Sequence, residues 1–156
     1  IEQDKSVLYL DFVDNPRHIM KTMLRIGKNA PIHTSASGKV LLSSFSTRKV
    51  EEIIAERGLE RLTEKTITDA ETLLEELSCI RSQGYAIDDE ECERGHRCIS
   101  VPIFDYSGNV TGAISAFDSF ERMTESRMQQ IILPELQRTA MEISLRLGYS
   151  LDDFMY

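Results

Sequence analysis

Basic residues are scarce in this sequence. Its 156 residues include 18 lysines and arginines against 26 aspartates and glutamates, which gives a formal net charge of -8 and a pI near 4.9. A nucleic-acid interface needs clustered lysines and arginines that contact phosphates. The scarcity argues against a nucleic-acid surface on this chain, so any control of DNA requires a part outside it.

Long apolar runs and paired cysteines are also missing. No apolar stretch reaches the roughly 18 residues of a membrane helix, and no basic segment followed by an apolar one suggests a secretion signal. The three cysteines, Cys79, Cys92 and Cys98, form no CxxC pair, and an odd number leaves no complete disulfide framework. These absences predict a soluble protein of the reducing cytoplasm with no membrane partner.

The remaining composition, 41% hydrophobic and 28% charged, is that of one soluble globular domain with a single core. No internal repeat or low-complexity linker divides residues 1–156. Val7–Val13 is rich in β-branched and aromatic residues and predicts a strand. This strand begins so early that its hairpin partner is expected upstream. We therefore expect a single domain that is an N-terminally truncated fragment of a longer protein.

Apolar residues at helical spacing, together with capping residues, predict four helices. Glycine is expected to end three of them, and Pro134 to kink or divide the last. The expected caps are Thr34 or Ser35, Thr47, the capping-box segment Thr68–Glu71 and Thr124, and the expected ends are Gly58, Gly84 and Gly148.

Strands with short connections complete the pattern. Cys98–Phe104 and Val110–Phe117 flank Asp105–Asn109, which predicts a hairpin, and His18–Ile26 is a candidate return strand for Val7–Val13. Adjacent antiparallel strands, rather than strict alternation of strand and helix, favour an α+β domain. Its helices are expected to pack against a mostly antiparallel sheet.

The stretch Thr34–Gly38 consists of small residues at an expected helix start. Unpaired N–H groups and the positive end of the helix dipole are receptive to a carboxylate there, and small side chains let a ligand approach the backbone. Ala36, Ser37 and Gly38 are therefore candidate ligand-binding residues. The pattern also suits a plain helix cap with tight packing, so both interpretations stay open.

Four acidic residues follow one another at Asp88–Glu91. They cannot all be buried, because an unpaired buried charge is very costly. In a strand, alternation would send Asp88 and Glu90 to one side and Asp89 and Glu91 to the other. The run is either a solvated acidic loop or the source of a carboxylate for a binding site.

Cys92, His96 and Cys98 lie close together and raise the question of a metal site. Structural zinc sites show CxxC-type pairs and four ligands, and neither is visible here. No feature places a base beside Cys98, which argues against a nucleophilic cysteine. We expect no metal, no other cofactor and no catalytic residue.

Two serines, Ser100 and Ser115, interrupt otherwise apolar strands. A hydroxyl on a covered face needs a hydrogen-bond partner, which is either the backbone or a ligand. Alternation groups each serine with its neighbours: Cys98, Ser100 and Pro102 on one face of the first strand, and Ala113, Ser115 and Phe117 on one face of the second.

Taken in order, these segments resemble the signature blocks of the IclR family of bacterial transcription regulators. Pro31–Lys39 (PIHTSASGK) is similar to the family's P-L-H-x-x-A-x-G-K block. Gly84–Glu91 (GYAIDDEE), with the helix before it, resembles the middle block, and Gly95–Asp105 (GHRCISVPIFD) resembles G-x-x-C-I-A-x-P-V-F-D. The closing helix also matches, so the resemblance covers about residues 7–148.

The resemblance implies a GAF-like effector-binding domain with a central, mostly antiparallel sheet flanked by helices. It implies that a winged helix-turn-helix domain, absent from this chain, binds the DNA. Members assemble as homodimers or homotetramers, and the effector is a small metabolite, often a carboxylate. The matching pocket positions are Ala36, Ser37, Asp88, Cys98, Ser115 and Phe117, with Ile19, Thr22 and Ala30 as apolar wall positions.

Three residues depart from the family's pattern. Phe117 stands where some members carry a serine, which removes a polar contact and reshapes the pocket. His96 occupies a position where an aliphatic residue is usual, and Ser100 replaces a common alanine. These departures prevent a simple transfer of the effector's identity from any one relative.

Electrostatics assigns different roles to the two ends of the effector. Two like charges about 4 Å apart repel by on the order of 4 kcal/mol at an effective dielectric constant of 20, so Asp88 should not face the effector carboxylate. We expect the carboxylate on the N–H groups of Ala36–Gly38, with Ser115 donating as well. Asp88 would accept a hydrogen bond from an effector hydroxyl. Sugar acids or keto acids are favoured over simple fatty acids.

Two functions of other classes stay open beside this one. The chain is alternatively a structural oligomerisation domain with a vestigial pocket, in which the small residues serve packing alone. A small hydrolase or metal-dependent enzyme would use Asp88–Glu91 and Cys98, but it lacks a recognisable base, metal quartet or phosphate loop.

Overall fold

Three antiparallel strands form the main sheet of the computed structural model, which describes residues 1–13, 27 and 29–150. Strand β5 (His96–Phe104) lies between β4 (Ala86–Asp89) and β6 (Val110–Ser119). The hairpin predicted between β5 and β6 is confirmed, with an irregularity in register near Phe104. The sheet brings the middle and the late parts of the sequence side by side.

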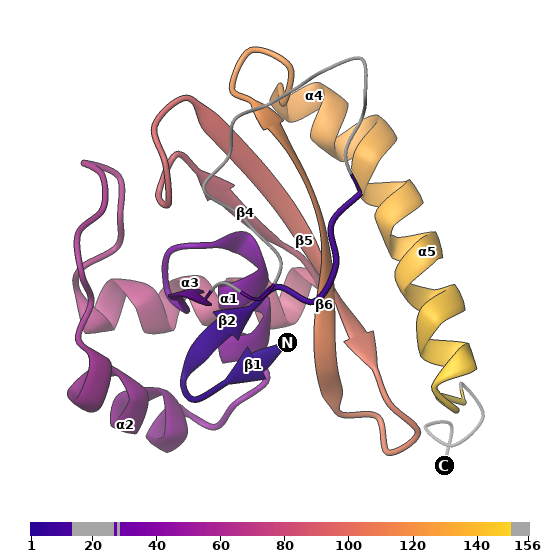
Figure 1. The fold of residues 1–156 in the computed structure, drawn as a ribbon, viewed down its shortest axis with the longest axis horizontal. Helices are drawn as coiled ribbons and strands as arrows, with labels where there is room; N and C mark the ends of the chain where they lie inside the picture. Colours follow the sequence, from indigo (N-terminus) through magenta and orange to yellow (C-terminus); the bar gives the residue numbers. More distant parts are fainter. Residues whose placement is uncertain (14–26, 28, 151–156) are drawn as a thin grey trace.

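Helices cover both faces of this sheet (Figure 1). On one face, α1 (Ala36–Ser43) contacts all three strands and packs against α3 (Ala70–Gln83), which contacts α2 (Thr47–Arg57). On the other face lies α5 (Leu133–Arg146), which packs on β5 and β6. The predicted α+β, GAF-like architecture with an antiparallel sheet between helices is therefore confirmed.

Each face has its own apolar core. The first contains Val40 and Leu77 among residues of α1, α2 and α3, and it packs against Cys98 and Ala113 of the sheet. The second joins Ile99 and Val101 with residues of the final helical segment. Alternate residues of β5 therefore belong to different cores, as a strand covered on both sides requires.

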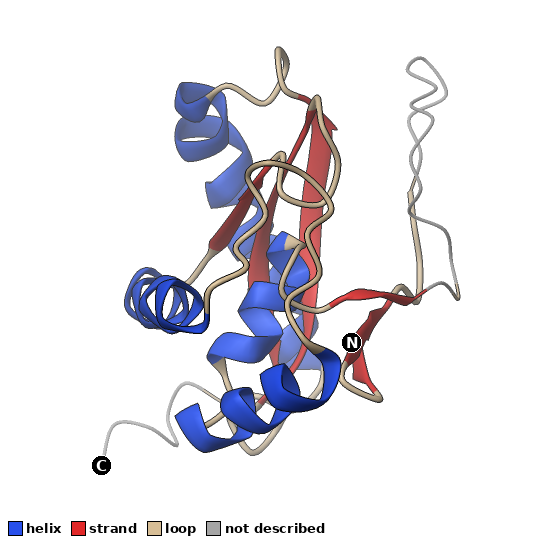
Figure 2. Cartoon of the chain, turned by 90° about the vertical axis from the view of Figure 1, so that its left-hand side faces the viewer, coloured by secondary structure: helices blue, strands red, loops and turns tan. Residues whose placement is uncertain are grey.

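A second, smaller sheet lies beside the main one (Figure 2). Its antiparallel strands are β1 (Glu2–Gln3), β2 (Ser6–Leu8) and β3 (Asn29–Pro31). The strand predicted over Val7–Val13 is thus too long, because only three residues of β3 are available to pair with β2. The expectation that its hairpin partner lies upstream of the chain is wrong, because β1, within the chain, pairs with β2. The return strand expected at His18–Ile26 lies outside the described residues.

Two predicted helix starts are wrong by one residue. The side chain of Ser46, not Thr47, caps α2, since its hydroxyl accepts the N–H of Lys49. For α3 the cap is Asp69 rather than Thr68, and the Asp69 carboxylate accepts both the N–H and the hydroxyl of Thr72. The predicted glycine ends at Gly58 and Gly84 are confirmed.

The final helix is divided, as Pro134 predicted. Thr124 caps α4 (Glu125–Arg127), a π-helical turn follows at Met128–Ile132, and α5 then begins with Pro134 in its first turn. Proline has no N–H to give to the helical ladder, and it lies where the ladder changes from π-helical to α-helical spacing. Among the described residues, no helix combines the length and apolarity needed to cross a membrane.

Candidate functional site

The start of α1 is a buried group of small residues. Ala36, Ser37 and Gly38 are all buried, and the Ser35 hydroxyl caps the helix by accepting the N–H of Gly38 at 3.1 Å. A Cβ atom on Gly38 would lie 1.9 Å from the carbonyl oxygen of Ile32. Glycine is therefore required for the helix to approach the preceding loop so closely.

The first two residues of α1 present N–H donors. Because Ser35 caps Gly38, the orphan N–H groups at this helix end are those of Ala36 and Ser37. Within the described residues, neither N–H donates a hydrogen bond to the backbone or to a side chain. Two buried donors at the positive end of a helix dipole can bind an anionic group.

Directly beside this helix start, the sheet aligns three of the predicted residues. Asp88 pairs with Cys98 across β4 and β5, and Cys98 pairs with Phe117 across β5 and β6. Residues directly opposite in antiparallel strands share a face, so the three side chains form one row. Cys98 belongs to the core beneath α1, which places the row on the face that α1 covers.

Asp88 is buried, with 7% of its surface exposed. Its Oδ1 accepts the N–H groups of Glu91 at 2.7 Å and Cys92 at 3.2 Å. Burial raises the pKa of Asp88 to about 7, although these hydrogen bonds oppose the increase. The carboxyl group therefore titrates near neutral pH.

The acidic run does not alternate as predicted. Strand β4 ends at Asp89, and Glu90 adopts a left-handed conformation with φ 62°. The chain therefore turns, and Glu91 is buried like Asp88 instead of sharing a side with Asp89. Asp89 and Glu90 lie outside the core and both pair with Lys65. Asp88 and Glu91 are therefore buried, and Asp89 and Glu90 lie at the surface.

The two serines form a second row next to the first. Ser100 and Ser115 are direct partners across β5 and β6, which confirms the face predicted by alternation. Ser115 donates to the Ser100 hydroxyl at 2.9 Å, and Ser100 donates to the carbonyl oxygen of Ile114 at 3.1 Å. Ser100 thus donates to the backbone, whereas Ser115 donates to the hydroxyl of Ser100.

The thiols near the site are not activated. Burial raises the pKa of Cys92 to about 11 and raises that of Cys98 further still. The reactive species of a cysteine is the thiolate, so protonated thiols are poor nucleophiles and poor metal ligands at neutral pH. In the described part of the chain, no group of three or more histidine, cysteine, aspartate or glutamate residues is placed to hold a metal ion.

Sequence reasoning missed the buried charge behind this site. Lys39, 1% exposed, forms ion pairs with Glu91 at 2.6 Å and with Glu76 at 3.2 Å. Its charge also acts on Asp88 and Cys98. Lys39 is part of the quoted Pro31–Lys39 motif, but a lysine on a short helix normally predicts a solvated position.

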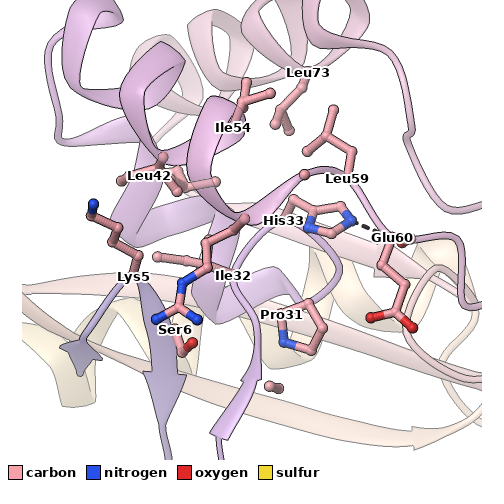
Figure 3. A pocket seen from close by; sticks show the side chains of 14 residues that line it. Lys5, Ser6, Pro31, Ile32, His33, Leu42, Ile54, Leu59, Glu60 and Leu73 are labelled. Atoms are coloured by element: carbon pink, nitrogen blue, oxygen red, sulfur yellow. Dashed lines mark hydrogen bonds between the residues drawn. The ribbon is translucent and has the colours of Figure 1, made fainter.

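A separate cavity of about 290 Å³ opens between α2 and the strands β2 and β3 (Figure 3). His33 lies in its wall, with Nε2 donating to the carbonyl oxygen of Glu60 at 3.0 Å. Of the predicted site residues, Ala30 lines this cavity, paired with Val7 in the small sheet. Ile19 and Thr22 lie outside the described residues.

Similarity to known proteins supports the same assignment as the motifs. Residues 1–145 match the family described as "Bacterial transcriptional regulator IclR C-terminal". The chain is 37% identical over 146 residues to the HTH-type transcriptional regulator KdgR of Escherichia coli, an alignment that covers 94% of this chain and 55% of KdgR. The chain thus spans about half the length of the curated relatives it matches.

Solved structures agree. The C-terminal domain of E. coli KdgR superposes with a TM-score of 0.83 at 36% identity, covering 95% of this chain and 84% of that one. A double mutant of the inducer-binding domain of PobR from Acinetobacter, in complex with 3-hydroxybenzoic acid, gives a TM-score of 0.85 at 30% identity, covering 92% and 84%. The chain belongs to the IclR family of bacterial transcriptional regulators and corresponds to their C-terminal effector-binding domain.

Proposed function

We propose that this domain senses a small hydroxylated carboxylate, with sugar-derived acids favoured, and that its occupancy controls DNA binding by the regulator to which it belongs. A winged helix-turn-helix part N-terminal to this domain would contact the DNA. The net charge of -8 supports this division, because an acidic domain repels DNA phosphates. Assembly as a homodimer or homotetramer would carry the signal between copies.

The effector carboxylate is assigned to the start of α1. The observation that carries the proposal is the pair of buried N–H donors on Ala36 and Ser37 beside the row of Asp88 and Cys98. Gly38 contributes by letting the backbone approach, since its own N–H is already capped by Ser35. Ser115 turns its hydroxyl from Ser100 to the carboxylate, which is the stronger acceptor.

Asp88 is assigned to the other end of the effector. Its Oδ1 is occupied by two backbone N–H groups, so the second carboxylate oxygen is the one available to an effector hydroxyl. A buried carboxylate that lacks such a donor is costly, and this cost selects against acids without a hydroxyl. Phe117 closes the same row with an apolar surface that suits the carbon skeleton of the ligand.

The PobR relative supports this class of ligand. It is described in complex with 3-hydroxybenzoic acid, a molecule with a carboxylate at one end and a hydroxyl at the other. The two groups match the two ends assigned above. Phe117 stands where an aromatic skeleton would also fit, so both aromatic and sugar-derived hydroxy acids belong in the test.

The test is thermal unfolding of the domain at pH 8 with D-gluconate, pyruvate, 3-hydroxybenzoate and hexanoate. An acid present at 100 times its Kd adds about 2.7 kcal/mol, which corresponds to roughly 5 to 10 °C for a domain of this size. We expect this shift from a hydroxy acid and a much smaller one from hexanoate. The absence of any shift from all four acids would favour a purely structural domain instead.

Asp88→Asn makes the test specific. The asparagine keeps an oxygen for the N–H groups of Glu91 and Cys92 but loses the anionic acceptor. It should weaken hydroxy acids by about tenfold or more and leave hexanoate unchanged. Asp89→Asn, at the solvated neighbour that pairs with Lys65, is the matched control. An equal loss of all acids in Asp88→Asn would contradict the role given to this carboxylate.

A further inference from the structure

Tyr9 lies at the candidate site, although it is distant from the other site residues in sequence. It follows β2 directly and packs partly buried against the core beneath α1, together with Cys98. The hydroxyls of Ser35 and Ser37 lie close enough to its phenol to lower the phenol's pKa, while the nearby thiols of Cys92 and Cys98 raise it. The phenol therefore reaches the start of α1, where the effector carboxylate is assigned.

The residues after Tyr9 continue over the same face of the sheet. The ring of Phe12 lies 5.5 Å from that of Phe117, centroid to centroid, at an angle of 34°. In Figure 1 the indigo segment that leaves β2 crosses β6. Tyr9 thus lies at the helix end of the site, and Phe12 lies over Phe117 at the end of the Asp88 row.

The groups around Tyr9 can direct several hydrogen-bond donors at one acceptor. The Ser35 oxygen already accepts the N–H of Gly38 and interacts with the Ser37 hydroxyl at 3.3 Å. The N–H groups of Ala36 and Ser37 can only donate, and the hydroxyls of Tyr9, Ser35 and Ser37 can each donate as well as accept. A buried cluster of this kind is satisfied by a group with several lone pairs and no proton, which a carboxylate provides.

We infer that Tyr9 is a specificity-determining residue of the effector site, whose hydroxyl donates a hydrogen bond to the effector carboxylate seated on Ala36 and Ser37. This inference rests on the proposed function and adds a contact from a segment outside the family's signature blocks. Burial raises the pKa of the Tyr9 phenol to about 12, so the hydroxyl keeps its proton and remains a donor at neutral pH. A hydrogen bond from a neutral donor to an anion is stronger than one between neutral groups.

A packing role for Tyr9 makes a different prediction. If the ring served only to fill the core beneath α1, phenylalanine would do so equally well, because it keeps the ring and loses only the hydroxyl. Tyr9→Phe therefore separates the two roles without opening a cavity. Tyr85→Phe is the matched control, since the Tyr85 hydroxyl accepts a hydrogen bond from Gln129 beside the opposite core.

The experiment is calorimetric titration of the wild-type domain, Tyr9→Phe and Tyr85→Phe with D-gluconate and 3-hydroxybenzoate, and with the corresponding amides. We expect Tyr9→Phe to bind the acids roughly 10- to 100-fold more weakly, as for loss of a hydrogen bond to a charged group, and the amides nearly as before. Tyr85→Phe should bind both acids like the wild type. Unfolding midpoints of all three proteins establish that the fold is intact.

Each contrary outcome has a distinct meaning. Unchanged acid binding in Tyr9→Phe, while Asp88→Asn still weakens it, overturns the role of Tyr9 and leaves the proposed function standing. Equal losses for acids and amides also overturn it, because the carboxylate would then not be the group that Tyr9 contacts. If the wild-type domain binds none of these acids, the proposed function fails, and the inference about Tyr9 fails with it.

Discussion

The ammonium group of Lys39 lies 2.6 Å from Glu91 Oε1, in surroundings that leave 1% of the lysine side chain and 9% of the glutamate side chain exposed. The pair connects α1 to the turn after β4 and thereby joins both halves of the candidate site. Glu91 Oε2 is buried with no hydrogen-bond partner in the described part of the chain. Lys39 is therefore the main compensation for a buried carboxylate.

Removing the charge of Lys39 should destabilise the domain strongly. In Lys39→Met the aliphatic stem is retained, but Glu91 becomes an uncompensated buried charge, which costs about 3 to 5 kcal/mol. The free energy of unfolding in urea measures this loss. The double variant Lys39→Met/Glu91→Leu should regain most of it, because both charges leave together.

Lys65, an exposed lysine that contacts the same acidic run, is the control for Lys39. Lys65 contacts Asp89 and Glu90 with 47% of its own side chain exposed. Lys65→Met should change the free energy of unfolding by less than about 1 kcal/mol, since exposed ion pairs contribute little. A loss in Lys39→Met no larger than this one would show that Glu91 is not held as a buried anion.

Gly38→Ala tests the close approach at the start of α1. The added Cβ would lie 1.9 Å from the Ile32 carbonyl oxygen, and a backbone atom cannot move aside as a flexible side chain can. The cost should reach or exceed the upper end of the roughly 1 to 3 kcal/mol of overpacking. We also expect weaker binding of hydroxy acids, because the shift displaces the N–H groups of Ala36 and Ser37.

Gly84→Ala is the comparison for Gly38. Gly84 ends α3 with φ +78°, and apart from its immediate chain neighbours no described residue comes within 4 Å of the position of an added Cβ. The substitution should cost about 1 to 2 kcal/mol through backbone strain alone and leave acid binding intact. Equal effects of the two alanines on binding would argue against a special role for the start of α1.

Short-range patterns predicted most of the fold. Alternation in β5 and β6 placed Ser100 and Ser115 on one face, and the structure pairs them directly, because a continuous strand preserves its period of two. The same rule failed at Asp88–Glu91. The strand ends there in a residue with positive φ, and a glutamate gives no local signal for that conformation.

The candidate site was only partly predictable for a related reason. Ala36 and Asp88 belong to recognisable motifs, and the fold brings their elements together. Tyr9 reaches the site through tertiary packing of a segment whose composition indicated only a strand. Lys39 is buried by contacts with Glu76 and Glu91, which lie 37 and 52 residues further along the chain. Neither position has a periodicity that reveals such long-range contacts.

Ser100→Ala should lower the stability of the domain more than Ser115→Ala does, whereas Ser115→Ala should weaken effector binding more. Ser100 is fully buried, donates to the Ile114 carbonyl and accepts from Ser115, so its loss leaves two groups unpaired and costs about 1 to 3 kcal/mol. Ser115→Ala removes one donor and should cost about 1 kcal/mol or less. Unfolding in urea measures both variants.

Acid binding should show the reverse order. The proposed function assigns Ser115 to the effector carboxylate, so Ser115→Ala should weaken binding of D-gluconate or 3-hydroxybenzoate about tenfold, and Ser100→Ala should weaken it less. Calorimetric titration under one set of conditions compares the two. If Ser100→Ala instead binds the acids more weakly than Ser115→Ala, Ser115 has only a structural role.

The pH dependence of stability should report the titration of Asp88. Its pKa rises from the ordinary 3.8 to about 7 on folding, chiefly because of burial, so the folded protein binds the proton more tightly than the unfolded chain does. The stability that this proton contributes is fully present below about pH 4 and is lost as the pH rises through 7. The loss is on the order of a few kcal/mol.

Asp88→Asn should remove this dependence, because the asparagine side chain stays neutral while its oxygen still accepts the N–H groups of Glu91 and Cys92. Urea unfolding midpoints measured from pH 5 to pH 8 should therefore fall in the wild type and change less in the variant. Part of the slope should persist, since burial also raises the pKa of Glu91. Parallel curves for the two proteins would mean that Asp88 stays ionised in the folded domain, with solvent or a cation compensating its charge.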